Sequence, residues 1–246
     1  MNKIISILNH KGGVGKTTTT VNLGAALRDR GYKVLLIDLD GQTNLTESVG
    51  LSTELPDNIY NAMKGETSLH IYIQNDLAIV PACLDLAAVE TELINEPGRE
   101  LILRSLLDKA KKAFDYILID CPPSLSLLTL NALTASDSVI IPVQAQFLAM
   151  RGMAKLMQVI DKVRNRLNPT LSIQGILITQ FDSRKNLNRN VDDVIRESFK
   201  EKVFNTHIRS NVSLAEAPTF GTDIFLYAPR SAGAADYSKL AEEITL

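Results

Sequence analysis

The stretch NHKGGVGKTTTT, residues 9–20, constrains this chain more than any other, because it crowds three glycines, two lysines and four threonines together. It follows a short β-branched apolar run, KIISIL, and precedes a segment with helical spacing of apolar residues. A strand, a glycine-rich loop and a helix in this order predict a phosphate-binding loop. Glycines let successive backbone N–H groups point at phosphate oxygens, and the helix N-terminus adds the positive end of its dipole. A glycine-rich turn without a ligand is the alternative.

The loop departs at one place from the usual phosphate-loop pattern, G-x-x-x-x-G-K-[ST]. If residues 15–17 (GKT) are its end, the first glycine would fall at His10, so residues 12–13 supply the flexibility instead. Lys16 is expected to lie along the β- and γ-phosphates, and the Thr17 hydroxyl is expected to bind Mg²⁺.

Acidic residues follow two further apolar runs. LLIDLDGQTN supplies Asp38 and Asp40, and YILIDCPPS supplies Asp120. An acid at the end of an apolar strand beside a phosphate loop is the expected partner of the metal, held directly or through water. A carboxylate that only caps the turn after its strand is the alternative.

Apolar runs that suit strands alternate with helical patterns along the whole chain. Strands are expected at 3–8, 33–38, 77–82, 116–120, 138–143, 173–180 and near 203–208, and helices at 16–30, 59–63, 86–94, 100–113, 125–135, 147–167, 191–199 and 232–244. Because the strands are apolar on both faces, they predict a mostly parallel twisted sheet with helices on both faces. The fold class is α/β, with residues 1–246 expected to form a single domain.

Composition excludes several classes of function. There is no Trp and only 5% aromatic residues, so no aromatic platform for stacking nucleic-acid bases is evident. The two cysteines, Cys83 and Cys121, have no CxxC spacing, which argues against a disulfide scaffold or a zinc site and fits a reducing cytoplasm. No apolar run approaches the ~18 residues that span a bilayer. A cytoplasmic protein without a membrane partner is expected.

The charge is unevenly distributed along the chain. The net charge is −2, yet residues 151–209 hold 12 Lys and Arg against six Asp and Glu. The rest of the chain holds 14 Lys and Arg against 22 Asp and Glu. A basic segment inside an acidic chain keeps binding to an anionic polymer open as a function.

The motifs together resemble a known family. KGGVGKTT, DLDGQ and IDCPPSLSLLTLNAL resemble the deviant Walker A class of P-loop ATPases, specifically the ParA/Soj partition ATPases. TASDSVIIPVQ, NVSLAEAP and YAPRSAGAADY extend the resemblance over nearly the whole chain. It implies a Mg²⁺-dependent ATP hydrolase, cytoplasmic and associated with the nucleoid, that works with a ParB-like protein partner. Such a protein moves or spaces a chromosome, plasmid or other cargo.

The resemblance also implies roles for individual residues. Lys11 would reach across an ATP-sandwich homodimer to the phosphates bound by the other subunit, where a second cation would offset charge on the transferred phosphoryl group. Asp40 would position or activate the attacking water, and Lys11, Lys16 and Asp40 would form the catalytic set. A solvated Lys11 is the alternative. The remaining implied contacts are nucleotide binding by Gly12, Gly13, Val14, Gly15, Thr17, Thr18, Asn211 and Pro218, and Mg²⁺ binding by Thr17, Asp38 and Asp120.

By the same resemblance, basic residues of the C-terminal half would bind double-stranded DNA without sequence preference in the ATP state. The candidates are Arg184, Lys185, Arg189 and Arg209. Contacts with phosphates would make the affinity fall steeply with salt. A solvated helix face is the alternative.

The chain departs from the family in three places. Gly41 stands where the family commonly has proline, and is expected to loosen the loop that carries Asp40. Ser213 replaces a frequent arginine, and Ser210 shifts a basic pattern by one residue. Weaker or differently arranged DNA binding is therefore expected.

Three related classes are the alternatives. A MinD-like ATPase would end in a basic amphipathic helix, whereas the tail YSKLAEEITL has a single lysine and two glutamates. An electron donor resembling the nitrogenase iron protein would use its cysteines as cluster ligands, whereas Cys83 and Cys121 suit buried apolar positions better. An ATPase that positions a protein cargo on the nucleoid is not distinguished by the sequence.

Overall fold

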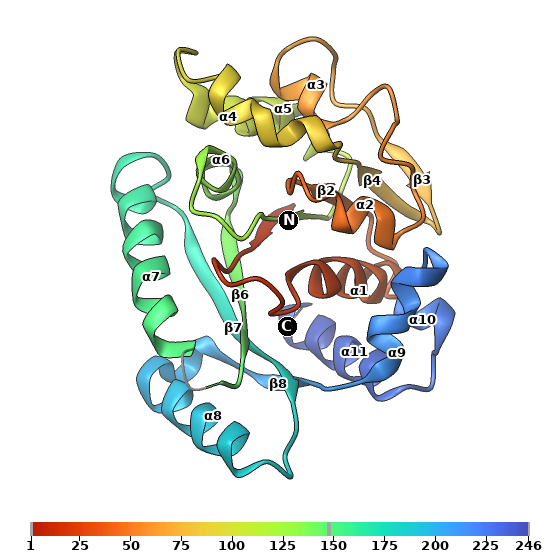
Figure 1. Cartoon of the computed structure of the whole chain (residues 1–246), viewed down its shortest axis with the longest axis vertical. Coiled ribbons are helices and arrows are strands. Elements are labelled where there is room, and N and C mark those ends of the chain that lie inside the picture. Colours follow the sequence, from red (N-terminus) through yellow and green to blue (C-terminus); the bar gives the residue numbers. More distant parts are fainter. Residues whose placement is uncertain (1, 147–148, 246) are drawn as a thin grey trace.

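The structure is a computed structural model that describes residues 2–146 and 149–245, and only the backbone at 149–151. Its strands form one eight-stranded sheet in the order β3-β4-β2-β5-β1-β6-β7-β8 (Figure 1). The strands are β1 (Lys3–Ile7), β2 (Val34–Asp38), β3 (Tyr72–Gln74), β4 (Leu77–Val80), β5 (Tyr116–Asp120), β6 (Ser138–Gln144), β7 (Ser172–Phe181) and β8 (Val203–Arg209). Every neighbouring pair is parallel except β3 and β4, which confirms the mostly parallel α/β fold.

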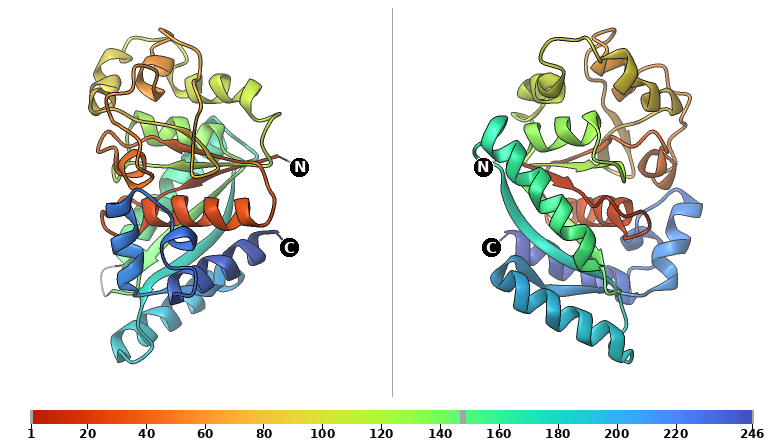
Figure 2. Two further views of the ribbon diagram at one scale, coloured as in Figure 1. Left: turned by 90° about the vertical axis from the view of Figure 1, so that its right-hand side faces the viewer. Right: turned by 60° about the vertical axis from the view of Figure 1, so that its left-hand side comes forward.

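Helices cover both faces of this sheet. They are α1 (Lys16–Asp29), α2 (Asn44–Ser48), α3 (Ile59–Met63), α4 (Val89–Glu92), α5 (Ile102–Ala110), α6 (Leu127–Ala135), α7 (Ala149–Arg166), α8 (Asn186–Phe199), α9 (Val212–Glu216), α10 (Ile224–Tyr227) and α11 (Ala232–Thr245). One apolar core lies between the sheet and α3 to α8, and a second lies between the sheet and α1, α2 and α9 to α11 (Figure 2).

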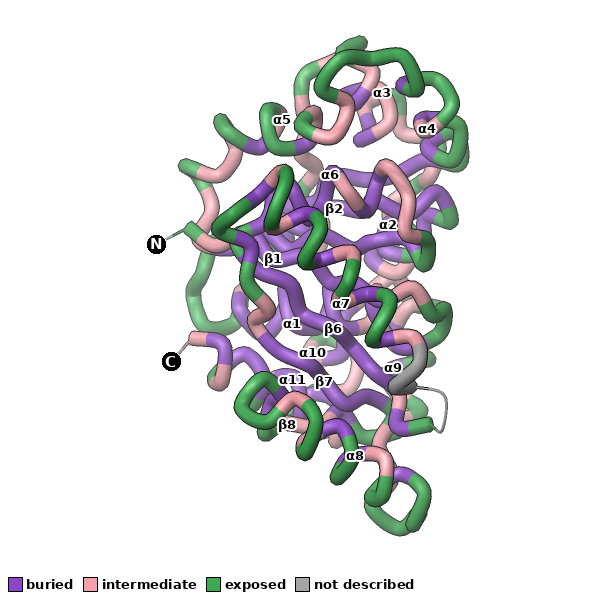
Figure 3. Tube along the Cα trace, turned by 90° about the vertical axis from the view of Figure 1, so that its left-hand side faces the viewer, coloured by how far each residue is buried: buried purple, intermediate pink, exposed green. Residues whose placement is uncertain are grey.

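The burial pattern explains why helices cover both faces of the sheet. Each residue of β2, β4 and β5 is buried, without the alternation that a half-exposed strand would show. The buried residues run through the sheet and α1, and the exposed residues lie mainly on the outer helices (Figure 3). Both faces of the central strands therefore need a helical cover.

Several elements differ from those expected. The short elements α2, β3, α9 and α10 were not predicted, and α8 begins at Asn186, five residues earlier than expected. β3 joins β4 through Asn75 and Asp76, which both have positive φ, as a tight hairpin turn requires. These elements are short and lie in segments without a recognisable apolar run or helical period. The first two residues of the expected helix 147–167 lie outside the described residues.

None of the helices in the described ranges is both long enough and apolar enough to cross a membrane.

Candidate nucleotide site

The candidate site lies where parallel strands end side by side. In the sheet register Asp38, the last residue of β2, pairs with Asp120, the last residue of β5. Asp120 also pairs with Ile7, the last residue of β1. The glycine-rich loop follows β1, so three strand ends bring this loop and two acids together. Ligands of open α/β sheets bind at this carboxyl edge.

The loop from Asn9 to Gly15 forms a concave backbone. Gly13 (φ 73°) and Gly15 (φ 86°) are left-handed, a conformation that residues with a Cβ avoid. Gly15 ends the loop and accepts the first helical hydrogen bond, from the N–H of Thr19 at 2.9 Å. Lys16 is 8% exposed at the first position of α1. The predicted glycine-rich turn before a helix is therefore present.

His10 stands where the strict pattern would have a glycine, and its ring packs against α7. A Cβ placed on Gly152 would overlap this ring, so loop and helix approach each other closely. Burial, with Lys155 and Lys16 nearby, lowers the pKa of His10. The residue that breaks the pattern thus makes a packing contact.

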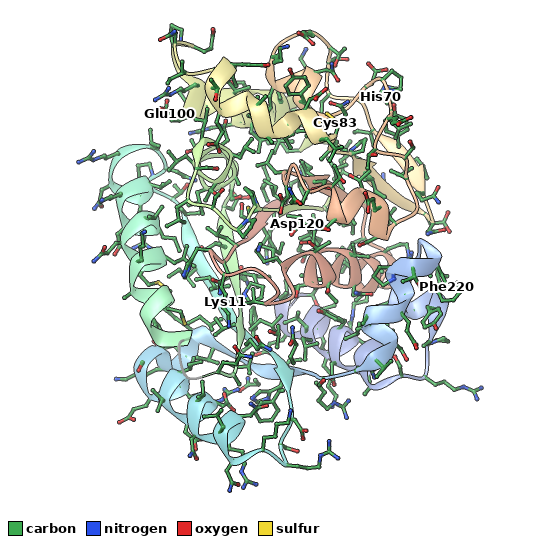
Figure 4. All side chains as sticks on the ribbon, viewed as in Figure 1. Lys11, His70, Cys83, Glu100, Asp120 and Phe220 are labelled. Carbon is green, nitrogen blue, oxygen red and sulfur yellow. The ribbon has the colours of Figure 1, made fainter. Side chains whose placement is uncertain are left out.

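Lys11 points away from its own loop. It is exposed, and its Nζ donates a 2.6 Å hydrogen bond to Oε1 of Gln146, just after β6. Its backbone N–H is held by the side chain of Asn9 at 3.0 Å. Figure 4 shows Lys11 and Asp120 near the middle of the molecule, around the loop after β1.

Thr17 and Asp120, two of the residues expected to serve Mg²⁺, touch each other. The Thr17 hydroxyl donates to Oδ2 of Asp120 at 2.6 Å, and the Thr20 hydroxyl donates to Oδ1 at 3.3 Å. Asp120 is 1% exposed. Burial, together with the charge of Asp38, raises the pKa of Asp120 to about 8. No Lys or Arg of the described residues forms an ion pair with Asp120, although the charge of Lys16 partly offsets the rise in its pKa.

Asp38 is held by a residue that the sequence did not single out. The N–H and hydroxyl of Thr46 donate to its Oδ2 at 2.9 and 2.7 Å, and the N–H of Asp40 donates to Oδ1 at 3.1 Å. Burial raises the pKa of Asp38 to about 6. Thr46 in turn accepts a hydrogen bond from the N–H of Ala82, at 2.9 Å. Thr46 therefore links Asp38 to the segment after β4.

These oxygens suit a magnesium ion. Two buried carboxyl groups and a hydroxyl supply the oxygen ligands that Mg²⁺ prefers, and two neighbouring carboxylates are stabilised by binding a divalent cation. No cluster of three or more His, Cys, Asp or Glu side chains arranged for a metal occurs among the described residues. The site thus resembles one where the protein supplies a few ligands and a phosphate supplies others.

The loop that carries Asp40 is covered. Oδ1 of Asp40 accepts the N–H of Gln42 at 3.0 Å, and Asp40 is 8% exposed. Gly41 is buried, and a Cβ placed on it would lie 3.0 Å from the backbone nitrogen of Ala87. Gly41, which stands where the family commonly has proline, therefore packs closely against the 3₁₀ helix Leu84–Ala88.

A cavity of about 410 Å³ adjoins the loop, and none of the three acids is among its lining residues. Gly15 of the loop and Thr18 of α1 line it, and Asn211 lines it from the C-terminal half. Asn211 also caps α9, accepting the N–H of Leu214 at 3.3 Å, so the segment NVSLAEAP contains a short helix. Pro218 follows in a second helical turn and is not among the lining residues.

Three of the four basic candidates gather at the junction of β7 and α8. Arg184, Lys185 and Arg189 are exposed there, and the Arg184 side chain is 88% exposed. Two nitrogens of Arg184 donate to Asp182 at 2.9 and 3.0 Å, which lowers the pKa of Asp182 to about 2.

Arg209 lies apart from this group, at the end of β8. Its guanidinium donates to both carboxylate oxygens of Asp236, at 2.6 to 3.1 Å. Arg209 also lines the cavity beside Asn211. Arg209 therefore lies near the glycine-rich loop and forms an ion pair with Asp236.

Both thiols are buried and free, as expected for small apolar residues. Burial raises the pKa of Cys83 and of Cys121. Such thiols are poor metal ligands, because the thiolate is the form that binds.

Two glycines join the Asp38–Asp40 side of the site to the C-terminal segment. Gly50 (φ 82°), after α2, meets Gly221 (φ 64°), after the 3₁₀ helix Ala217–Phe220. A Cβ placed on Gly221 would lie 2.8 Å from the Cα of Gly50. The Asn75 side chain donates to the Gly221 carbonyl at 3.0 Å.

Gly221→Ala is therefore expected to lower the free energy of unfolding by about 3 kcal/mol, from the left-handed backbone and the overlap with Gly50. Gly65→Ala is the matched control, since Gly65 (φ 75°) has nothing within 4 Å of an added Cβ. It is expected to cost about 1 kcal/mol. Denaturant unfolding measures both, and equal losses would show that the Gly50 contact contributes nothing.

Comparisons with known proteins agree with this geometry. Residues 2–173 match the family described as AAA domain. The sporulation initiation inhibitor protein Soj of Bacillus subtilis is 45% identical, with 99% of this chain and 98% of Soj covered. The chromosome-partitioning ATPase Soj of Treponema pallidum is 42% identical, with 99% and 97% covered.

A solved structure shows the same fold. Cobyrinic acid a,c-diamide synthase from Mycobacterium smegmatis, with bound ADP and magnesium, superposes with a TM-score of 0.88 at 35% identity. The match covers 98% of this chain and 93% of that one. The ligands of that protein, ADP or an ATP analogue with magnesium, agree with the expected cofactors, ATP and Mg²⁺. From its loop, its acids and its relatives together, this chain belongs to the ParA/Soj family of partition ATPases.

Proposed function

We propose that this chain hydrolyses ATP to ADP and phosphate as an ATP-sandwich homodimer, and binds non-specific double-stranded DNA in the ATP state. A ParB-like partner would stimulate hydrolysis and release the DNA. The cycle would position a chromosome, plasmid or other cargo on the nucleoid, with residues 1–246 acting as one domain. The alternative is a MinD-like or cargo-positioning ATPase whose partner is a membrane or a protein.

The position of Lys11 carries this proposal. Lys16 is buried at the start of α1, whereas Lys11 is exposed, and among the described residues its Nζ bonds only to the neutral side chain of Gln146. No carboxylate of the described residues forms an ion pair with Lys11. A free cation at the rim of a phosphate loop supports a role on the phosphates of a second subunit.

The other residues divide the chemistry among them. The loop N–H groups and Lys16 would hold the phosphates, and Thr17, Asp38 and Asp120 would hold Mg²⁺. When bound, Mg²⁺ neutralises charge on the phosphate oxygens. Asp40, next to Asp38 and beside the loop, would orient the attacking water and accept its proton. Gly12 would allow two loops to approach each other.

The basic group at the start of α8 supports the DNA role. Arg184, Lys185 and Arg189 project from one junction that follows directly on β7. Each side chain that neutralises a DNA phosphate displaces a counterion. Arg209 is expected to contribute less than these three, because it lies apart from them beside the cavity and its partner Asp236 is buried.

A salt series tests the DNA role. Asp40→Ala, which should hold the ATP dimer, is expected to bind a random-sequence duplex with ATP and not with ADP. Adding Arg184→Ala should weaken binding equally for all sequences and reduce the slope of log K against log salt by about 1. Fluorescence anisotropy measures both.

Lys109→Ala, an exposed lysine on α5, is the control and should leave the slope unchanged. If the ATP dimer forms, as seen by sizing, but binds no DNA, the DNA role is wrong. Binding of that dimer to anionic vesicles instead would favour the MinD-like alternative.

A further inference from the structure

The phosphate loop is held from outside its motif by the end of β7. The Thr179 hydroxyl donates to the carbonyl of Val14 at 2.8 Å, and Nε2 of Gln180 donates to the carbonyl of Gly13 at 2.7 Å. Thr179 is 2% exposed, and both residues line the cavity next to Gly15. Two consecutive residues thus bind two consecutive carbonyls of the loop.

These contacts fix the direction of two N–H groups. The carbonyl of one residue and the N–H of the next share a planar peptide unit and point in opposite directions. Turning the Gly13 and Val14 carbonyls towards β7 therefore turns the N–H groups of Val14 and Gly15 the other way. Within the described part of the chain, neither N–H group donates to a protein acceptor. Both are left available for an anion.

Gln180 itself is held in a costly conformation. Its φ of 50° is left-handed, which residues with a Cβ adopt only where the surroundings impose it. Nε2 of Gln144, at the end of β6, donates to Oε1 of Gln180 at 2.6 Å. This bond aims the other end of the same amide at the Gly13 carbonyl. The ends of β6 and β7 therefore orient the loop together.

We propose that Thr179 and Gln180 are positioning residues that preset the loop for phosphate. By holding two carbonyls outward, they keep the Val14 and Gly15 N–H groups directed at the phosphates before nucleotide arrives. The inference rests on the proposed role of residues 11–18 in binding phosphate. A preset cradle binds more tightly because no ordering of the loop is needed on binding.

The test is the affinity of the purified full chain for a fluorescent ADP analogue with Mg²⁺. Thr179→Val keeps the shape and removes the donor, and Gln180→Met does the same for the exposed side chain. Thr179→Val is expected to weaken binding about 5- to 30-fold, the usual effect of leaving a buried hydrogen-bond partner unsatisfied. Gln180→Met is expected to weaken it about 2- to 10-fold, because water can replace the lost bond at the exposed Gly13 carbonyl. Thr179→Ser, which keeps the hydroxyl, should bind within about twofold of the unchanged protein.

Gln174→Met is the matched control, because it makes the same substitution about 20 Å away on the same strand and should leave the affinity unchanged. Unchanged affinity in both Thr179→Val and Gln180→Met would overturn the inference, as would equal weakening by Thr179→Ser and Thr179→Val. If Thr179→Val does not fold, Gln180→Met alone decides. Failure of the unchanged protein to bind the analogue would instead refute the proposed role of the loop.

Discussion

Replacing Lys11 by alanine is expected to lower the rate of ATP hydrolysis about 1,000-fold, while one chain still binds ATP. The Lys11 ammonium contacts Gln146 and takes no part in its own loop, so nucleotide binding by a single chain should not need it. A cation supplied by a second subunit is worth roughly 10³ to 10⁵ in the rate of phosphoryl transfer. The predicted dimer would lose this cation together with a contact between its subunits.

Steady-state hydrolysis, nucleotide titration and analytical ultracentrifugation with ATP measure the three consequences. Lys33→Ala is the control. Lys33 is also exposed, but it precedes β2 and so lies at the amino ends of the strands, opposite the predicted site. The Lys33→Ala protein should match the unchanged protein in hydrolysis rate, nucleotide affinity and dimerisation. A Lys11→Ala protein that dimerises and hydrolyses ATP normally would remove the main support for the ATP-sandwich dimer.

Asp40→Ala is expected to lower hydrolysis by about 10² to 10⁴, the usual contribution of a general base, without loss of ATP affinity. Asp40 lies at the carboxyl edge next to Asp38, yet its carboxylate bonds only to the N–H of Gln42 among the described residues. It is therefore not needed to hold another side chain in place.

Single-turnover hydrolysis and an ATP titration separate the two effects. Asp85→Ala is the control, because Asp85 is an exposed acid in the Leu84–Ala88 segment that packs on Gly41. It should hydrolyse ATP at the normal rate. An Asp40→Ala protein that loses ATP affinity as strongly as it loses rate would assign Asp40 to binding instead.

The sequence predicted the parts of the site that lie next to a strand in the chain. The loop, Asp38 and Asp120 each follow an apolar run, and parallel strands bring their carboxyl ends to one edge. The central strands could be predicted because most of their residues are apolar. The short elements α2, β3, α9 and α10 have no such pattern.

Other parts of the site depend on contacts between distant residues. Thr179 meets Val14 and Gln180 meets Gly13 only after the sheet has formed, and neither Thr nor Gln stands out as a residue type. Thr46 holds Asp38 in the same inconspicuous way. The number of basic residues in the sequence could not show that Asp236 forms an ion pair with Arg209.

The central place of β1 also has a consequence for how the protein is made. β1 leaves the ribosome before both of its sheet neighbours, β5, which begins at Tyr116, and β6, which begins at Ser138. Parallel pairing over such separations is slow to form. The growing chain therefore carries an unpaired apolar strand at least until β5 has been synthesised. The predicted site combines the ends of β1, β2 and β5, so we expect ATP to bind only to chains in which these strands have already paired.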